Sequence, residues 1–233
     1  IRFHIGEAAA AAADSFTVRI EDASGTLMRR IRGEVEPGMH EVQWNLALQL
    51  EGADGELMDP GPRVMPGTYR AALQVDGMAA TAMSEFDVLL DPRAEITRSQ
   101  LMARHAAMLE SYRLSGPAEQ AEDALDDAED RLDDALERAR EAGDDALVQR
   151  VEAALERREE LEDALDDAGD GAGAWFSIQS IHMPPTESQL DAIDRSWEEL
   201  PGVIREINAW LAGELPDVLS AAAEVAMPAP DAM

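Results

Sequence analysis

The hydrophobic period of this chain changes once, at residues 88–93, and that change limits what the chain can fold into. Before it, apolar and polar residues alternate in short runs bounded by Gly and Pro, as in half-buried strands. After it, apolar residues recur every three or four positions, as in helices. Pro92 has no backbone N–H and restricts Asp91 to extended backbone, so a strand should end there. The chain is therefore predicted to be an α+β protein with two domains, residues 1–91 and 92–230.

Residues 1–91 are predicted to form an antiparallel β-sandwich of immunoglobulin-like type, because short strands follow one another at close spacing. The expected strands cover residues 2–5, 16–20, 27–32, 40–46, 68–75 and 82–90, with turns at 22–26, 37–38 and 76–77. Trp44 alternates with Val42 and Leu46, which favours a core position over an exposed platform for sugar stacking. Tyr69 is expected to be a corner residue whose hydroxyl binds backbone.

Residues 92–230 are predicted to form a bundle of long antiparallel helices. Two segments have apolar residues at steps of three and four, at positions 121, 125, 128, 132, 135 and 139 and at 147, 151, 154, 161, 165 and 168. They should form an acidic hairpin over about residues 117–168, with Arg158 at its one poor position. A break is expected at 115–117. C-terminal helices are expected over about 186–226, starting at a capping box formed by Thr186 and Gln189, with kinks or restarts at Pro201 and Pro216 and a frayed end at 226–233.

The chain is strongly acidic, with a formal net charge of −30 at pH 7. All 19 basic residues are Arg, and residues 119–170 carry 22 acidic residues against 6 Arg, a net −16. Nucleic acid and anionic membrane surfaces are therefore poor partners. A solvated acidic face is the simpler interpretation, and adaptation to high salt is the alternative. With no Cys, disulfides and thiol chemistry are excluded. No apolar run is long enough to span a membrane.

Residues that could carry chemistry are scattered, and none is predicted to be catalytic, cofactor-binding or metal-binding. Adjacent acids at 126/127, 133/134 and 166/167 could suggest a two-carboxylate glycosidase, but neighbours on a helix point about 100° apart. The acids Asp54, Glu56 and Asp59 share one Gly-rich loop without the spacing of a calcium loop. The four His residues, at 4, 40, 105 and 182, are spread over different predicted elements. No cofactor is expected.

A resemblance covers nearly the whole chain. The motifs that carry it are Val18-Arg19-Ile20-Glu21-Asp22-x-x-Gly25, Gly38-x-His40-x-Val42-x-Trp44-Asn45 and Pro66-Gly67-Thr68-Tyr69, followed by Asp91-Pro92-Arg93 and a long helical tail. The series is similar to Ig-like domains of the flagellar hook-capping type, although Asn45 stands where related domains often carry Asp. With the tail it resembles the C-terminal region of secreted bacterial sortilin-like or BNR-repeat "glycosyl hydrolase" proteins. The resemblance implies a β-propeller upstream of Ile1 in the same polypeptide.

Three functions follow as expectations. The first is a non-catalytic accessory module that packs on, spaces or anchors the upstream propeller of a secreted, periplasmic or cell-envelope protein. The second is a module that binds a protein or a glycan, which a contiguous exposed aromatic patch would favour. The third is part of a glycosidase whose active site lies upstream of residue 1. Whether the whole protein is an enzyme stays open at this point.

Overall fold

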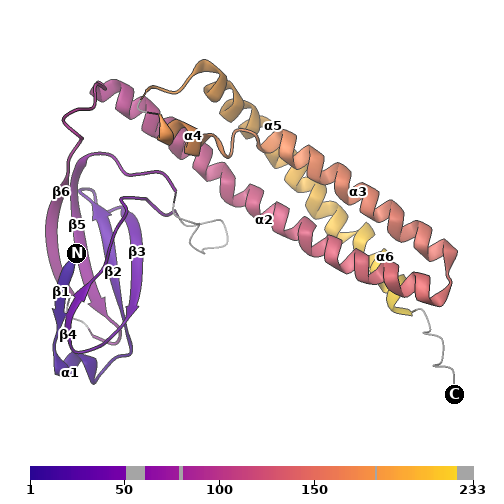
Figure 1. Cartoon of the computed structure of the whole chain (residues 1–233), viewed down its shortest axis with the longest axis horizontal. Helices are drawn as coiled ribbons and strands as arrows, with labels where there is room; N and C mark the ends of the chain where they lie inside the picture. The colour runs from indigo at the N-terminus through magenta and orange to yellow at the C-terminus, as the bar shows by residue number, and fades with distance from the viewer. Residues whose placement is uncertain (51–60, 79–80, 182, 225–233) are drawn as a thin grey trace. The chain divides into compact units, whose positions relative to one another are not determined.

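The computed structural model describes residues 1–50, 61–78, 81–181 and 183–224. It is a mixed protein with long helices and two small antiparallel sheets, so the predicted combination of helix and sheet is confirmed (Figure 1). The predicted Asp54–Glu56–Asp59 loop, His182 and the frayed end at 226–233 lie outside the described residues.

The sheets are built from short antiparallel strands. In the smaller sheet β1 (Arg2–Ile5) pairs with β4 (Gly38–Glu41). The larger sheet has the order β3-β2-β5-β6, with β2 at Ser15–Asp22, β3 at Leu27–Glu34, β5 at Gly67–Val75 and β6 at Thr81–Val88. Along β2 the side chains of Phe16, Val18 and Ile20 are buried, and they share one core with Ile5 of the smaller sheet. The period-two prediction for these strands is therefore confirmed.

The predicted turns are also present. Gly77 follows β5 with a φ of +75°, a left-handed conformation that favours glycine. The β2–β3 turn is held by the Asp22 carboxylate, which accepts hydrogen bonds from the backbone N–H groups of Ser24 and Thr26, each at 2.9 Å.

The strand predicted over residues 40–46 is wrong beyond Glu41. Leu46 has a φ of +66°, which a strand cannot contain. The chain bends there, and residues 46–48 pair with residues 61–64 instead, as in the 2.8 Å bond from Val64 N–H to the Leu46 carbonyl. The alternation of Val42, Trp44 and Leu46 gave no warning of this long-range pairing.

The helices are α1 (Glu7–Ala10), α2 (Arg98–Ala142), α3 (Asp145–Gly169), α4 (Ala174–Ser180), α5 (Glu187–Ala212) and α6 (Glu214–Glu224). The predicted break at 115–117 is wrong, because α2 continues through Pro117 for 45 residues. Leu114 and Ala121, before and after the proline, are buried in one core, so packing compensates for the hydrogen bond that proline removes. Pro201 likewise lies inside α5, whereas Pro216 lies in the first turn of α6.

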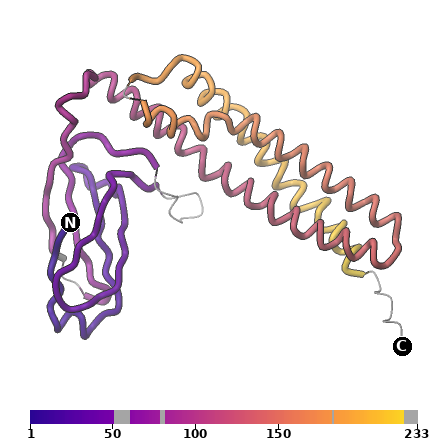
Figure 2. Tube along the Cα trace, viewed as in Figure 1, coloured from indigo at the N-terminus to yellow at the C-terminus, as the bar shows by residue number. Residues whose placement is uncertain are grey.

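The predicted connection between α2 and α3 is confirmed. Gly143 turns the chain with a φ of +69°, and the Asp144 side chain caps α3 by accepting a 3.0 Å bond from Leu147 N–H. The capping box of Thr186 and Gln189 is present at the start of α5. All twelve predicted apolar seam positions are buried in one core, which α5 and α6 also line. Figure 2 shows α3, α5 and α6 side by side.

Contacts divide the chain into two compact units. Residues 1–112 and 175–185 form the first, here called the sheet unit, and residues 113–174 with 186 onward form the second, the helical unit. This division falls inside α2, whereas the sequence predicts a boundary at Pro92. The reason is that Leu109 and Tyr112 pack into the core of the sheets. An added Cβ at Gly61 would lie only 2.4 Å from the Tyr112 ring. Independent folding of residues 1–91 and 92–230 stays a prediction.

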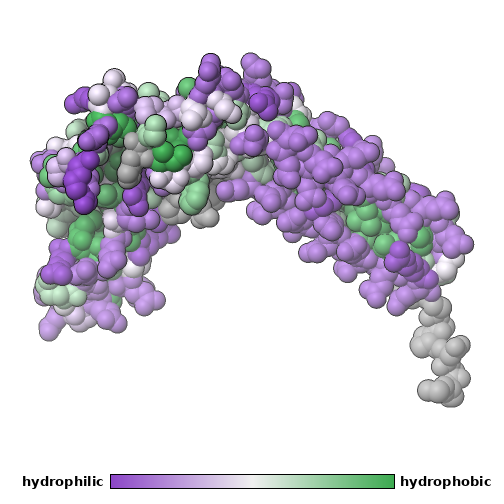
Figure 3. Space-filling view, turned by 45° about the horizontal axis from the view of Figure 1, so that its top comes forward, coloured by the Kyte–Doolittle hydropathy of each residue, from purple (hydrophilic) through white to green (hydrophobic). Residues whose placement is uncertain are grey.

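The surface of the helical unit is polar. Figure 3 shows hydrophilic residues over most of its visible face. The acid pairs at 126/127, 133/134 and 166/167 are all exposed, as the sequence predicts for a solvated face. None of the helices in the described part has both the length and the apolar composition needed to cross a membrane.

Candidate functional site

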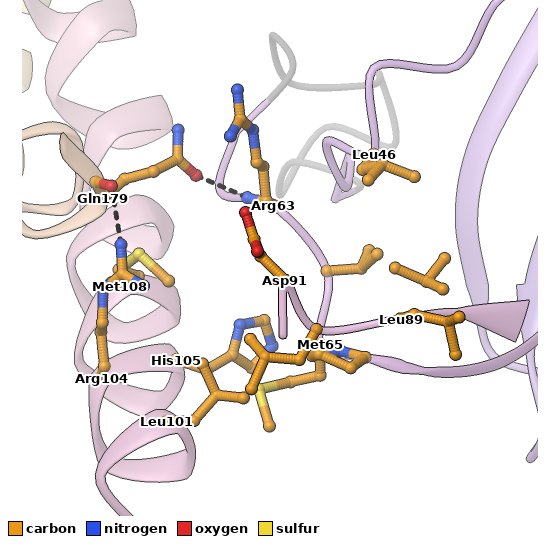
Figure 4. Close-up of a pocket in the computed structure, with 14 residues that line it drawn as sticks. Leu46, Arg63, Met65, Leu89, Asp91, Leu101, Arg104, His105, Met108 and Gln179 are labelled. Carbon is orange, nitrogen blue, oxygen red and sulfur yellow. Dashed lines mark hydrogen bonds between the residues drawn. The ribbon is translucent and has the colours of Figure 1, made fainter. Parts of the chain in front are cut away.

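A cavity of about 200 Å³ opens in the sheet unit (Figure 4). One wall is the α2 face that carries Leu101, Arg104, His105 and Met108, which are spaced three or four residues apart and therefore share one side of the helix. The facing wall comes from the chain around Leu46, from residues 63–66 and from residues 88–91 at the end of β6, and Gln179 of α4 completes the lining.

Arg104 and Gln179 hold α4 against α2. The Arg104 guanidinium donates from Nε to the Ile178 carbonyl at 3.1 Å and from Nη2 to the Gln179 carbonyl at 2.6 Å. These are carbonyls at the end of α4, which have no partner within their own helix. The Gln179 side-chain oxygen accepts a 2.6 Å bond from Arg63 N–H. The polar end of the cavity is thus fixed by bonds to backbone.

The imidazole of His105 forms part of the inner wall. Burial lowers its pKa below the ordinary value, and the positive charge of Arg104 acts in the same direction, while a hydrogen bond with the Arg63 backbone opposes them. With an ordinary pKa of about 6.5 for histidine, the ring is neutral at pH 7. Its Nδ1 is buried and has no hydrogen-bond partner among the described residues. His105 therefore adds a neutral surface to the cavity.

A second, more polar cavity of about 560 Å³ adjoins the first and shares five of its lining residues, Arg63, Leu90, Asp91, Leu101 and Arg104. Arg93 also lines it and forms an ion pair with Asp91, with Nη2 2.7 Å from the carboxylate. The hydrogen bond to Asp91 raises the pKa of Arg93. Burial lowers the pKa of Arg104, and the positive charge of Arg63 lowers it further. The charged residues that line this cavity in the described part of the chain are three arginines and Asp91.

Trp44 and Tyr69 both serve the core of the sheet unit. The Trp44 indole N–H donates to the Ala47 carbonyl at 2.8 Å, and its ring meets those of Tyr69 and Phe86 edge-on at 5.6 and 6.1 Å. The Tyr69 hydroxyl donates to the Met65 carbonyl at 2.5 Å, so its predicted bond to backbone is confirmed. Burial raises the pKa of Tyr69, and the charge of Asp22 contributes. The predicted core position of Trp44 is confirmed by its contacts with the core, although its side chain is only half-buried.

The described acid pairs and histidines lie on the surface, in ion pairs or against the core. Asp126 binds Arg158 at 3.1 Å, and the other five paired acids are exposed. His40 stacks on Phe3 at a ring distance of 5.4 Å, His4 is exposed and His105 lines the cavity described above. In the described ranges no group of three or more His, Asp or Glu side chains could hold a metal ion.

The sequence does not predict the cavity. Its polar lining includes Arg63, Arg104 and Gln179, which come from three segments separated by long stretches of chain. One signal was available, because Arg104 and His105 lie on the same helical stripe as Leu101 and Met108 and interrupt it with two polar side chains. The Leu46 backbone conformation, at the edge of the cavity, had no such signal.

Comparison with known proteins adds no relative: no family model, curated protein or solved structure matches the chain.

Proposed function

We propose that the chain is a non-catalytic accessory module of a longer secreted or cell-envelope polypeptide. In this proposal its sheets are an Ig-like sandwich, its helices are an antiparallel bundle, and its partner is a β-propeller of the same polypeptide. The proposal rests on the motif resemblance described above and on one structural observation, which concerns the buried polar side chains.

The observation is that buried polar side chains form hydrogen bonds that hold the fold together. In the described part of the chain the buried polar residues are Ser111, Arg158 and Ser196. The Ser111 hydroxyl accepts from Trp175 N–H at 2.8 Å, and the Ser196 hydroxyl accepts from Gly171 N–H at 2.9 Å. Both bonds fix a backbone connection. Enzymes instead direct buried polar groups into a pocket where the reacting atoms lie.

Ser196 illustrates the structural role. The backbone at Gly171 approaches α5 so closely that an added Cβ would lie 2.4 Å from the Ala192 carbonyl oxygen. Gly171 therefore allows the chain after α3 to pack directly on α5, and Ser196 holds it there. The buried serine thus fixes the position of the backbone, which suits a module that spaces or supports another domain.

The glycosidase alternative places catalysis upstream of Ile1. Its two-carboxylate chemistry needs a proton donor with a raised pKa opposite a second carboxylate, with room for a sugar between them. The exposed acid pairs of α2 and α3 do not supply this arrangement. The proposed module therefore carries no hydrolytic step of its own.

The purified chain should release no aryl leaving group from a panel of chromogenic α- and β-glycosides above the rate in buffer. The measurement is absorbance over several hours at pH 5, 7 and 9, with a variant carrying Asp126→Asn and Asp127→Asn as a matched control. Turnover that this variant, or its equivalents at 133/134 or 166/167, abolishes would contradict the proposal.

A further inference from the structure

The two adjoining cavities of the sheet unit differ in character. The smaller one, here called the inner cavity, has apolar walls from Met65, Leu89 and Met108, with the neutral His105 ring beside them. The larger one, here called the outer cavity, has three arginines and the Asp91 carboxylate as its charged lining among the described residues. In Figure 4 the Arg104 side chain runs along α2 to Gln179, whose side chain is bonded to the Arg63 backbone, and Leu101, His105 and Met65 lie below them. The pair thus places apolar side chains beside a group of arginines, of which Arg63 and Arg104 line both cavities.

Two of the three arginines have no carboxylate partner among the described residues. Asp91 pairs with Arg93 and balances its charge, whereas Arg104 donates two of its five N–H groups to uncharged carbonyls of α4. The side chain of Arg63 has no ion pair or hydrogen bond with any described residue, and only its backbone binds Gln179. Arg63 and Arg104 line the same two cavities, and the positive charge of Arg63 adds to the effect of burial in lowering the pKa of Arg104. Two neighbouring guanidinium groups with free donors form a receptor for an anion.

The excess of positive charge here is unusual for this chain. The whole sequence carries −30, and its 19 arginines face 49 acidic residues. Among the described residues, the outer cavity has three arginines to one acid, a local net of +2 from Arg63, Arg93, Arg104 and Asp91. An anion that approaches the protein meets attraction at this cavity, and the surrounding negative charge favours a small ligand with a single charge over a polyanion.

We propose that the paired cavities bind a monocarboxylate that carries one apolar group of side-chain size. The carboxylate lies between Arg63 and Arg104, where charge-assisted hydrogen bonds from guanidinium are strong and directional. The apolar group fills the inner chamber of about 200 Å³ against Met65, Leu89 and Met108. A free N-acylated amino acid and the C-terminal residue of a peptide both present this chemistry.

Binding is tested by isothermal titration and by NMR shift mapping of the purified chain with N-acetyl-leucine. Saturable binding is expected, and N-acetyl-leucinamide, which lacks the charge, should bind at least about tenfold more weakly. A five-residue peptide ending in leucine, with a free or an amidated C-terminus, separates the two sources. If the free-acid peptide binds more tightly than N-acetyl-leucine, the ligand is the C-terminus of a peptide. If it binds equally or more weakly, the ligand is a small free acid.

Three variants locate the site. Arg63→Gln, whose side chain has no structural bond in the described residues, should weaken N-acetyl-leucine about tenfold. Leu101→Trp should also weaken it, by filling the chamber. Arg98→Gln, an exposed arginine at the start of α2 outside both cavities, is the matched control and should bind as the parent does. No saturable binding, equal binding of acid and amide, or an Arg63→Gln variant that binds normally would each overturn the proposal. These results are independent of the proposed accessory role, which hydrolysis and native-mass measurements test.

Discussion

Replacing Arg158 by Ala should destabilise the helical unit by about 3 kcal/mol, the lower end of the cost of breaking a buried charge network. Arg158 is 8% exposed, and its guanidinium binds carboxylates on two helices, Asp126 at 3.1 Å, Glu129 at 2.7 Å and Glu162. It also donates to the Leu125 carbonyl at 3.4 Å. Because the three carboxylates are partly exposed, water offsets some of the loss when the arginine is removed.

Removal of Arg158 also leaves three negative charges close together in a region that is already strongly acidic. Arg158→Met keeps most of the packing and loses the charge, so it should cost less than Arg158→Ala but still destabilise. Arg150→Ala, an exposed arginine on the same helix, is the control and should change stability by less than about 0.5 kcal/mol. The measurement is urea unfolding followed by far-ultraviolet circular dichroism. If Arg158→Ala behaved like Arg150→Ala, the network would contribute nothing to the packing of α2 and α3.

Replacing Trp44 by Ala should cost the sheet unit about 3 kcal/mol, the lower end of the range for truncating a core aromatic residue. The ring contacts Tyr69 and Phe86, and the indole N–H donates a hydrogen bond to the Ala47 carbonyl, in the segment that follows β4. Both the packing and the hydrogen bond are lost in the variant. Partial exposure of the ring keeps the expected value below that of a fully buried tryptophan.

Urea unfolding followed by tryptophan fluorescence and backbone amide NMR measures the effect of Trp44→Ala. Met39→Ala, on β4 with an exposure of 71%, is the control and should change stability by less than about 0.5 kcal/mol. A loss below about 1 kcal/mol for Trp44→Ala would place the ring functionally on the surface, and would revive the role of a sugar-stacking platform.

The sequence predicted those helices, strands and caps that are determined by residues close together in the chain. The alternation in residues 16–20 and 68–75 became β2 and β5, and the steps of three and four became the buried seam of α2 and α3. The cap of α5 was also predicted, because the side chains of Thr186 and Gln189 each accept a hydrogen bond from the backbone N–H of the other residue. These features need only neighbours within a few residues.

Features that depend on distant partners were not predicted. The end of β4 at Glu41 follows from the pairing of Leu46 with Val64, and the uninterrupted course of α2 follows from burial before and after Pro117. The candidate site is the extreme case, since Arg63 and Gln179 are 116 residues apart. Arg158, a poor seam residue by periodicity, is accommodated because Asp126 and Glu129 reach it from α2. Only its partner Glu162, one turn along the same helix, could be seen in the sequence.

The free energy of unfolding of the helical unit should depend on salt concentration, because its surface is strongly acidic. Several arginines of the hairpin are engaged, as in the 3.2 Å pair of Arg140 with Glu152, but residues 119–170 hold 22 acids against 6 Arg. Repulsion between the remaining acids weakens with salt, since the Debye length falls from about 30 Å at 0.01 M to about 3 Å at 1 M. The stability differences proposed for Arg158 should therefore be measured at one fixed ionic strength.

The most direct test of the accessory-module proposal is the intact mass of the native polypeptide, isolated from its source and mapped by peptide mass spectrometry. The proposal predicts a mass well above the 25.3 kDa of this chain, with peptides upstream of Ile1 that repeat in the manner of propeller blades. A native protein of about 25.3 kDa with no upstream peptides would contradict it.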